Sequence, residues 1–457
     1  MRCEEQRPAL WIERLRLAIL STTHLPPLDP DAPATLATPS VLPLDVSPEE
    51  IHTPDEPWVG AFIAGLSGWT LDAFDFFLVV LSLTAIGREF GQDVKHMTLA
   101  LTATLALRPV GAFFFGGISD RFGRRIPMIV NLCLFAVVEL ATGFTRSFVT
   151  FLAVRAVFGV VMGGQWGVGV SLAMEKVPTR YRGVLSGLLQ QGYSIGFLLA
   201  AAAYFLIEPK YGWRPLFYLG SLPALAAAGF VALRVRESEV WRLTKHSSFA
   251  GLGRALASHW KLFVYFTVFM MAMHMSSHGT QDLYPTFLEK DWGIVGKQKA
   301  ALTAISMVGA ILGGLSIGWI SDRVGRRWAM IGALVGAIAS IPLWAFAHTL
   351  PLLVLGAVLM QFCVQGAWGV VPAHVAELSP DSVRGTLPGL GNQVGVLLSS
   401  VVVYLEAGFA KGRTYAGSMS MTAAMVFCLA IVLTLVGREK KAQVFGSRED
   451  VGAGASE

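Results

Sequence analysis

Residues 116–125 read GGISDRFGRR, and residues 318–327 read GWISDRVGRR. Eight of these ten positions are identical at an offset of 202 residues. The same offset, without a gap, also pairs Trp166 with Trp368, Glu175 with Glu377, Pro178 with Pro380, Arg182 with Arg384, Gly183 with Gly385 and Gln191 with Gln393. The chain therefore carries an internal repeat that spans most of its length.

The composition around this repeat is that of a membrane protein. Of the 457 residues, 54% are hydrophobic and only 15% are charged, whereas soluble domains carry about 25% charge. This balance excludes an ordinary soluble enzyme and a disordered protein. Apolar stretches long enough to cross a bilayer recur from Trp58 onward. Twelve spans are predicted at 59–84, 97–118, 126–143, 148–174, 184–206, 214–233, 260–285, 300–320, 328–347, 351–375, 385–405 and 415–436.

Six predicted spans separate the two copies of the repeated motif, so both copies have the same orientation. We therefore expect an all-α membrane protein with two parallel six-helix repeats, 58–233 and 260–436, related by an axis along the membrane normal. With the N-terminus inside, 24 Lys and Arg residues fall in inner loops and tails and 10 in outer loops. This bias predicts cytoplasmic termini. It also accounts for the basic pI, so no nucleic-acid partner is expected.

The segments outside the spans are polar. Residues 1–57 hold 10 of the 22 prolines and are predicted to form a flexible cytoplasmic arm of unknown role. Residues 234–259 form a cytoplasmic linker and 437–457 a cytoplasmic tail. Charges within Ala9–Leu20 argue against a signal peptide. Together with the short loops, this favours a bacterial inner membrane, although a eukaryotic plasma membrane would also fit.

Two motifs carry a family resemblance. The GxxxDRxGRR pattern after spans 2 and 8, and the ExxPxxxRG pattern after spans 4 and 10, resemble the signatures of the major facilitator superfamily. Carboxylates beside arginine pairs form charge-assisted hydrogen bonds readily, so this loop network could latch the halves together; simple orientation charge is the alternative. The predicted cytoplasmic gate comprises Asp120, Arg121, Arg124, Glu175, Arg182, Asp322, Arg323, Arg326, Glu377 and Arg384.

Ionisable residues inside the spans are candidates for function, because an ionisable group at mid-bilayer is costly. Asp72 and Asp75 in span 1 are three residues apart and should share a helix face. We expect one of them to hold a proton near neutral pH. Arg108 in span 2 and Arg155 in span 4 could bind an anionic substrate. Static ion pairs that brace the helices are the alternative.

Span 7 carries a second polar cluster. His274, His278, Gln281 and Asp282 fall on one helical face, and a His with an Asp one turn later can exchange a proton near physiological pH. Pro285 and Gly279 predict local bending. Polar side chains in four other spans complete a candidate cavity: Gln165, Trp166, Gln190, Gln191, Tyr193, Trp368, Asn392 and Gln393. Glu139 in span 3 has no assigned role.

The span-7 sequence SHGTQDLYPT, residues 277–286, resembles a signature of the lactate and pyruvate permeases of the sialate:proton symporter family. LDAFDFF in span 1 and LRPVGA in span 2 are also similar to that family. The resemblance implies proton symport of an organic acid, with His278, Gln281 and Asp282 near substrate or proton. Two departures are His274, where the fungal pattern has Asn, and Arg236, where sugar porters have Pro. The 234–259 linker cannot supply the two extra spans of sialic acid permeases.

The sequence therefore predicts a proton-coupled symporter of a small organic acid anion, such as lactate or pyruvate, that works by alternating access. Alternatives are a sialic acid or other organic-acid symporter, a non-transporting sensor and a carrier of neutral compounds. We expect a monomer with no cofactor and no metal, driven by the proton gradient, and no enzymatic activity. Predicted substrate-binding residues are Arg108, Arg155, Gln165, Trp166, Gln191, His278, Gln281, Trp368, Asn392 and Gln393; predicted proton-coupling residues are Asp72, Asp75, His278 and Asp282.

Overall fold

The computed structural model describes residues 58–243, 249–402 and 414–445. The predicted arm, residues 1–57, lies outside the described residues. Every regular element within the described ranges is helical, as expected. Residues Thr53–Glu457 form one compact unit, and all the elements below belong to it.

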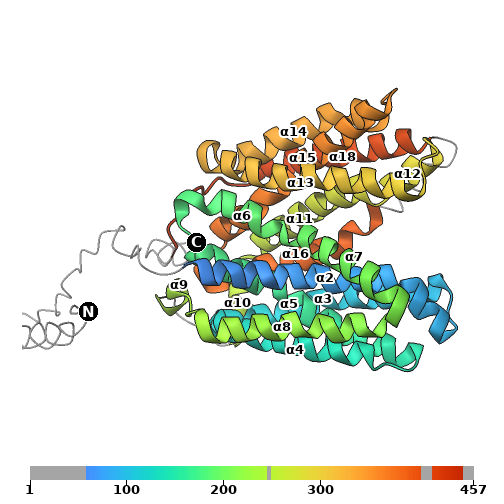
Figure 1. Ribbon diagram of the computed structural model, residues 1–457. Helices are drawn as coiled ribbons and strands as arrows, with labels where there is room; N and C mark the ends of the chain where they lie inside the picture. The colour runs from blue at the N-terminus through green and yellow to red at the C-terminus, as the bar shows by residue number, and fades with distance from the viewer. Residues whose placement is uncertain (1–57, 244–248, 403–413, 446–457) are drawn as a thin grey trace, which may run out of the picture. The chain divides into compact units, whose positions relative to one another are not determined.

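The N-terminal half runs from α2 to α8 (Figure 1). Its elements are α2 (Trp58–Phe90), α3 (Val94–Phe122), α4 (Arg125–Gly143), α5 (Phe148–Lys176), η1 (Thr179–Tyr181), α6 (Arg182–Gln190), α7 (Gly192–Tyr211) and α8 (Arg214–Arg234). Two short helices follow in the linker, α9 (Glu239–Leu243) and α10 (Phe249–Ser258).

The C-terminal half repeats this order. Its elements are α11 (Trp260–Gln281), α12 (Tyr284–Lys290), α13 (Gly296–Val324), α14 (Arg326–Ala345), α15 (Leu350–Leu378), η2 (Asp381–Val383), α16 (Leu387–Ser399) and α18 (Tyr415–Val436). The bounds of α13, α15 and η2 are those of α3, α5 and η1 shifted by 202 residues. The sequence repeat is thus also a repeat of helices.

Equivalent helices pack in equivalent ways. In the first half α3 packs on α5 and α4 on α8; in the second half α13 packs on α15 and α14 on α18. Glycine permits the closest of these approaches, as it does between helices in membranes. A Cβ atom at Gly163 of α5 would lie 1.9 Å from the carbonyl oxygen of Arg108, and one at Gly313 of α13 would lie 1.9 Å from that of Phe362.

The backbone conformation explains why the repeated motif has a glycine before its two final arginines. Gly123 and Gly325 end α3 and α13 with φ of 100° and 102°, a backbone region that side chains disfavour. In both cases the glycine N–H donates back to the helix, to Ser119 and Ser321. The tight reversal sends the chain directly into α4 and α14.

Within the described residues, ten helical segments are long and apolar enough to cross a membrane by length and composition. The other two predicted spans correspond to α11 and α16. The helix of α11 is interrupted after Gln281, and Pro285 stands in the first turn of α12, so the bend predicted near Gly279 and Pro285 is confirmed. The described part of α16 ends at Ser399, and the following segment from 403 lies outside the described residues.

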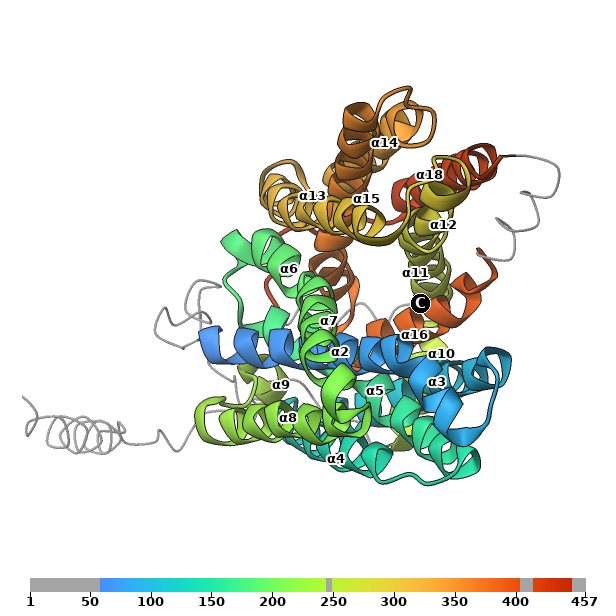
Figure 2. The same cartoon turned by 45° about the vertical axis from the view of Figure 1, so that its right-hand side comes forward.

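The two halves meet through a second symmetric pattern. Helix α6 of the first half packs against α13 and α15, and α16 of the second half packs against α3 and α5 (Figure 2). These four contacts bring the loops after α5 and α15 next to the motifs that end α3 and α13.

Candidate functional site

The repeated aspartates join the two halves. Asp120 of the first half accepts hydrogen bonds from the backbone N–H groups of Gly385 at 2.8 Å and Thr386 at 2.9 Å, and from the Thr386 hydroxyl at 2.6 Å. Asp322 of the second half accepts from the N–H groups of Gly183 at 2.8 Å and Val184 at 3.0 Å. Each carboxylate therefore caps the start of a helix in the other half, where negative charge is stabilised.

Buried arginines hold these carboxylates in place. Arg124 bonds Asp120 at 2.7 Å and Glu175 at 3.0 Å. In the second half Arg326 bonds Asp322 at 2.7 Å and Glu377 at 3.0 Å. Two further ion pairs cross between the halves, from Arg182 to Glu377 at 3.2 Å and from Arg384 to Glu175 at 3.7 Å.

Eight of the ten predicted gate residues thus meet in one network. Arg121 and Arg323 extend over the rings of Phe122 and Trp319. The network joins the two halves on the side of the molecule that carries the basic loops.

Sequence reasoning missed two members of this network. Glu237 accepts from the backbone N–H groups of Arg124 and Arg125, at 2.7 Å and 3.1 Å. Glu439 does the same for Arg326 and Arg327, at 3.2 Å and 2.9 Å. The signal was present, because these two glutamates are also 202 residues apart.

A second missed feature is the start of the C-terminal tail. Phe445 is 4% exposed, and the guanidinium carbons of Arg182 and Arg384 lie 4.0 Å and 3.8 Å from its ring centroid. Arg182 also donates to the carbonyl oxygen of Gln443 at 2.9 Å. One aromatic ring of the tail therefore contacts an arginine from each half.

The polar spans enclose a cavity of about 260 Å³ between the two halves. Helices from both halves line it, and its walls are largely aromatic and apolar. The lining residues are Trp69, Asp72, Ala73, Phe76, Leu105, Arg108, Met162, Gln190, Tyr193, His274, Ser277, His278, Asp282, Gln365, Trp368, Asn392, Val396, Ser399, Ser400 and Val402.

The cavity brings together some of the predicted site residues and leaves others outside. Arg108, Asp72, His278, Asp282, Trp368 and Asn392 line it. The other predicted residues, which are not among the lining side chains of the described chain, are Asp75, Arg155, Gln165, Trp166, Gln191, Gln281 and Gln393.

Several of the residues outside the cavity have partners within their own surroundings. Gln281 donates to the side-chain oxygen of Gln361 at 2.8 Å, and Gln191 accepts from Ser194 at 3.3 Å. Gln393 donates to the Gly163 carbonyl at 3.5 Å. The amides of Gln281 and Gln393 thus link neighbouring helices in this conformation, whereas the Gln191 bond is local to the start of α7.

Asp72 and Asp75 do not act as one pair. Asp72 bonds Arg108 at 3.0 Å on the cavity wall. Asp75 accepts hydrogen bonds from both terminal nitrogens of Arg155, with N–O distances of 3.0 Å and 2.5 Å, and does not line the cavity. Positions three apart on a helix differ by about 60° in direction, which is enough to aim the two carboxylates at different helices. The shared face expected from the sequence is therefore split between two ion pairs.

The cavity pair is incompletely satisfied. Oδ1 of Asp72 and Nε of Arg108 are buried without a hydrogen-bond partner, although the two side chains bond one another through their other atoms. Buried polar atoms without partners are unusual. The pair thus keeps an acceptor and a donor unused at the cavity wall.

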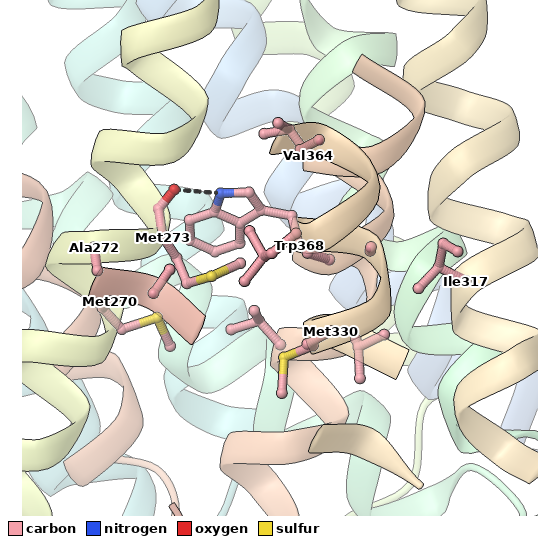
Figure 3. Packing of buried hydrophobic residues seen from close by; sticks show 14 of the residues in the cluster. Met270, Ala272, Met273, Ile317, Met330, Val364 and Trp368 are labelled. Carbon is pink, nitrogen blue, oxygen red and sulfur yellow. Dashed lines mark hydrogen bonds between the residues drawn. The ribbon is translucent and has the colours of Figure 1, made fainter. Parts of the chain in front are cut away.

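The opposite wall comes from α11, α15 and α16. The His274 ring bonds the Asn392 side-chain oxygen at 3.0 Å and lies 4.6 Å from the Trp368 ring centroid. Figure 3 shows how Trp368 is fixed: its indole N–H donates to the Met273 carbonyl at 2.9 Å, among methionine and aliphatic side chains.

Nearer the end of α11, His278 Nδ1 lies 3.2 Å from Asp282 Oδ2, and these side chains are 36% and 40% exposed. The cavity-lining side chains at the end of α11 farther from the basic loops are thus partly exposed.

Lining residues such as Trp69, Phe76 and Gln365 were not predicted. Trp69 and Phe76 stand one helical turn before and after Asp72, so the 3.6-residue period of an α-helix could have found them. Among the described residues, no group of three His, Cys, Asp or Glu side chains could hold a metal ion.

The fold and this central cavity define a class: a helical membrane transporter built from two related halves. Residues 58–281 match the family model described as Major Facilitator Superfamily, and residues 255–438 match the one described as Sugar (and other) transporter. The chain has the fold of the major facilitator superfamily and is a transporter rather than an enzyme.

Similar proteins include a carboxylic acid transporter protein homolog of Saccharomyces cerevisiae. It is 29% identical over 426 residues, covering 83% of this chain and 68% of the relative. The cis,cis-muconate transport protein of Acinetobacter baylyi is 25% identical over 394 residues, covering 84% and 95%. The solved structure of the proton:xylose symporter XylE, 16% identical, matches with a TM-score of 0.70 over 86% of this chain and 98% of that chain. At that identity the match shows the fold alone.

Proposed function

We propose that this transporter is a proton-coupled symporter of a small organic acid anion, with lactate and pyruvate as the first candidate substrates. The observation that carries the proposal is the Asp72–Arg108 pair on the cavity wall. Arginine is permanently charged and presents a planar fork that matches a carboxylate. Asp72 bonds one terminal nitrogen of that guanidinium, and a substrate carboxylate that approaches the same nitrogen would compete with it.

The proposed coupling follows from this competition. While Asp72 is ionised, it occupies Arg108. When Asp72 takes a proton, the guanidinium is freed and attracts the carboxylate of the substrate into the cavity. The anion and one proton then enter together without net charge. Such transport is driven by the pH gradient, with roughly tenfold accumulation per pH unit.

The loop network has the role of the gate in this proposal. In the conformation described here the halves are joined beside the basic loops, and the lining side chains of His278 and Asp282, at the other end, are partly exposed. With the predicted orientation this is an outward-facing state. Breaking the bonds of Asp120 and Asp322 to the opposite half would let the halves rock and release substrate and proton inside.

A second candidate substrate class is supported by the cavity walls. Trp69, Phe76, Tyr193 and Trp368 line the same cavity as Arg108, and flat aromatic walls suit a planar unsaturated acid. The relatives named for carboxylic acid and muconate transport fit either class.

The test is transport by the purified protein in liposomes. Counterflow and pH-driven uptake are measured with radiolabelled lactate, pyruvate, muconate and nicotinate. The proposal expects Asp72→Asn to keep counterflow and to lose uphill accumulation, because Arg108 is then free at every pH. A wild-type protein that shows no flux with any of these acids would refute the proposal and favour a sensor. Flux of neutral compounds that survives Arg108→Ala would favour a carrier of neutral solutes.

A further inference from the structure

Glu139 is a buried carboxyl group in α4 that the proposed coupling does not use. Its side chain is inaccessible, with 0% exposure, and neither of its oxygens receives a hydrogen bond from the described chain. The backbone of α8 closes over it: a Cβ atom at Gly220 would lie 2.6 Å from Oε1 of Glu139 and 3.2 Å from a ring carbon of Phe74. An ionised carboxylate in such surroundings would be left without solvation.

The charged neighbours of Glu139 are Asp75 of α2 and Arg155 of α5. Arg155 is already committed, because both its terminal nitrogens bond Asp75 and its guanidinium carbon lies 4.0 Å from the Phe158 ring centroid. On the other helices that pack against α4, the titratable groups also have partners. Tyr218 of α8 donates to the Gly143 carbonyl, and Arg108 of α3 bonds Asp72.

This arrangement has one positive charge for two carboxyl groups. Both terminal nitrogens of Arg155 bond Asp75, and neither oxygen of Glu139 has a hydrogen-bond partner within the described part of the chain. Two carboxyl groups side by side can bond one another only if one of them carries a proton. We propose that Glu139 is a proton-binding site of this transporter, holding a hydrogen ion beside the Asp75–Arg155 ion pair and exchanging it with Asp75.

The unused atoms support such an exchange. Nε of Arg155 is buried without a partner, as are both oxygens of Glu139. If Asp75 takes the proton, Arg155 has donors available for an ionised Glu139. The three residues therefore accommodate one hydrogen ion in either of two arrangements, and the total charge of the group is the same in both.

The site is separate from the substrate cavity. Asp75, Glu139 and Arg155 are absent from the cavity lining, whereas Asp72, one turn earlier on α2, is part of it. The carboxyl group of Glu139 thus does not compete with the substrate for Arg108. This inference rests on the proposed symport for its role in transport, but the presence of the proton itself can be measured without any substrate.

The first test is infrared spectroscopy of the purified protein at neutral pH. The wild-type minus Glu139→Gln difference spectrum should contain the carbonyl stretch of a protonated carboxylic acid. Asp75→Asn should also remove this band, because Arg155 is then free to pair with an ionised Glu139. The control Glu289→Gln, which changes an exposed carboxylate bonded to Lys299, should leave the band in place. A band that persists in Glu139→Gln, or a difference spectrum that shows an ionised carboxylate instead, overturns the proposal.

Two further measurements complete the test. Glu139→Met, which is apolar and of similar size, should fold with a melting temperature near that of the wild type if Glu139 is neutral. A large drop in melting temperature for both the Met and the Gln variant would mean that Glu139 is an ionised structural partner, contrary to the proposal. The third measurement is transport in liposomes with an acid for which the wild type shows counterflow. Glu139→Gln should keep that counterflow and lose pH-driven accumulation; unchanged accumulation would remove Glu139 from the coupling. If the wild type carries none of the acids, the symport proposal fails while the infrared result still decides whether Glu139 holds the proton.

Discussion

Replacing Asp120 by Asn should open the gate beside the basic loops. Asp120 accepts three hydrogen bonds from the opposite half, from the N–H groups of Gly385 and Thr386 and from the Thr386 hydroxyl. Hydrogen bonds to a charged group contribute about 1.5–3 kcal/mol each. Asparagine keeps one neutral acceptor, whose bonds are about half as strong. We therefore expect the closed state to lose about 3 kcal/mol, which shifts the equilibrium toward the open state by a factor of roughly 100.

Accessibility of Ser186 measures this shift. Ser186 of α6 has 0% exposure, and its hydroxyl donates to the Gly369 carbonyl of the other half at 2.7 Å. Ser186→Cys, made in a protein without its native cysteines, can react with a membrane-impermeant maleimide only when the halves separate on this side. Labelling from the basic-loop side should therefore become roughly 100-fold faster in Asp120→Asn, in line with the equilibrium.

The matched control is Glu439→Gln. Glu439 is also a carboxylate that caps two backbone N–H groups, but both belong to its own half. Its loss should destabilise α14 locally and leave the labelling rate close to that of the parent. Equal rates in Asp120→Asn and the parent, or equal acceleration in both variants, would refute the assignment of Asp120 as a link between the halves.

Three further outcomes are expected. Phe445→Ala removes two cation–π contacts of about 0.5–1 kcal/mol each, so labelling at Ser186→Cys should accelerate about 5–30-fold; no change would exclude the tail from the gate. Arg108→Ala should abolish counterflow of radiolabelled lactate, whereas Arg108→Lys should keep a weaker flux, since only the charge remains; full flux in the Ala variant would contradict this. Gly163→Val should lower the melting temperature strongly, because its Cβ would overlap the Arg108 carbonyl, while Gly229→Val, with open space around it, should not; similar melting temperatures would contradict the packing argument.

The fold and the charged network between the halves were largely predictable because their determinants are local and duplicated. Gly123 and Gly325 adopt a backbone conformation that other residues disfavour. The acids and arginines next to them recur at the same offset of 202 residues. Reading that offset to its end would also have found Glu237 and Glu439. Phe445 carries no such signal, because nothing in the sequence says that the tail returns to the arginines of both halves.

The cavity was less predictable, because its composition depends on which way each helix faces. Asp72 and Asp75 look equivalent in the sequence, yet a small difference in direction gives one to Arg108 at the cavity and the other to Arg155. Likewise, Trp166 and Trp368 are repeat partners, but only Trp368 lines the cavity. Pairing between helices that are far apart in the chain decides these cases.

The sequence repeat shows which residue types the two halves share and which differ between them. The gate residues have counterparts of the same type at the offset of 202, as Asp120 and Asp322 illustrate. A gate that joins related halves needs equal bonds from each side, so duplication suits it. Equivalent positions of the two halves also line the cavity, but there the residue types differ. The counterpart of Asp72 is His274, and that of Gln190 is Asn392; all four line the cavity.

The arginines of the two acid–arginine pairs, and Glu139, have apolar counterparts in the second half. The positions that correspond to Arg108, Glu139 and Arg155 are Ala310, Ile341 and Ala357. In the proposed mechanism this concentrates hydrogen-ion binding in the first half, while the second half contributes histidine, tryptophan and amide contacts to the substrate. A bound anion would then lie between the first half, which takes up and releases hydrogen ions, and the second half, which provides fixed contacts. For that reason the proposed coupling should be sensitive to substitutions at Asp72, Asp75 and Glu139 and much less so to substitutions at Asn392 or Trp368, which should alter which acid is preferred.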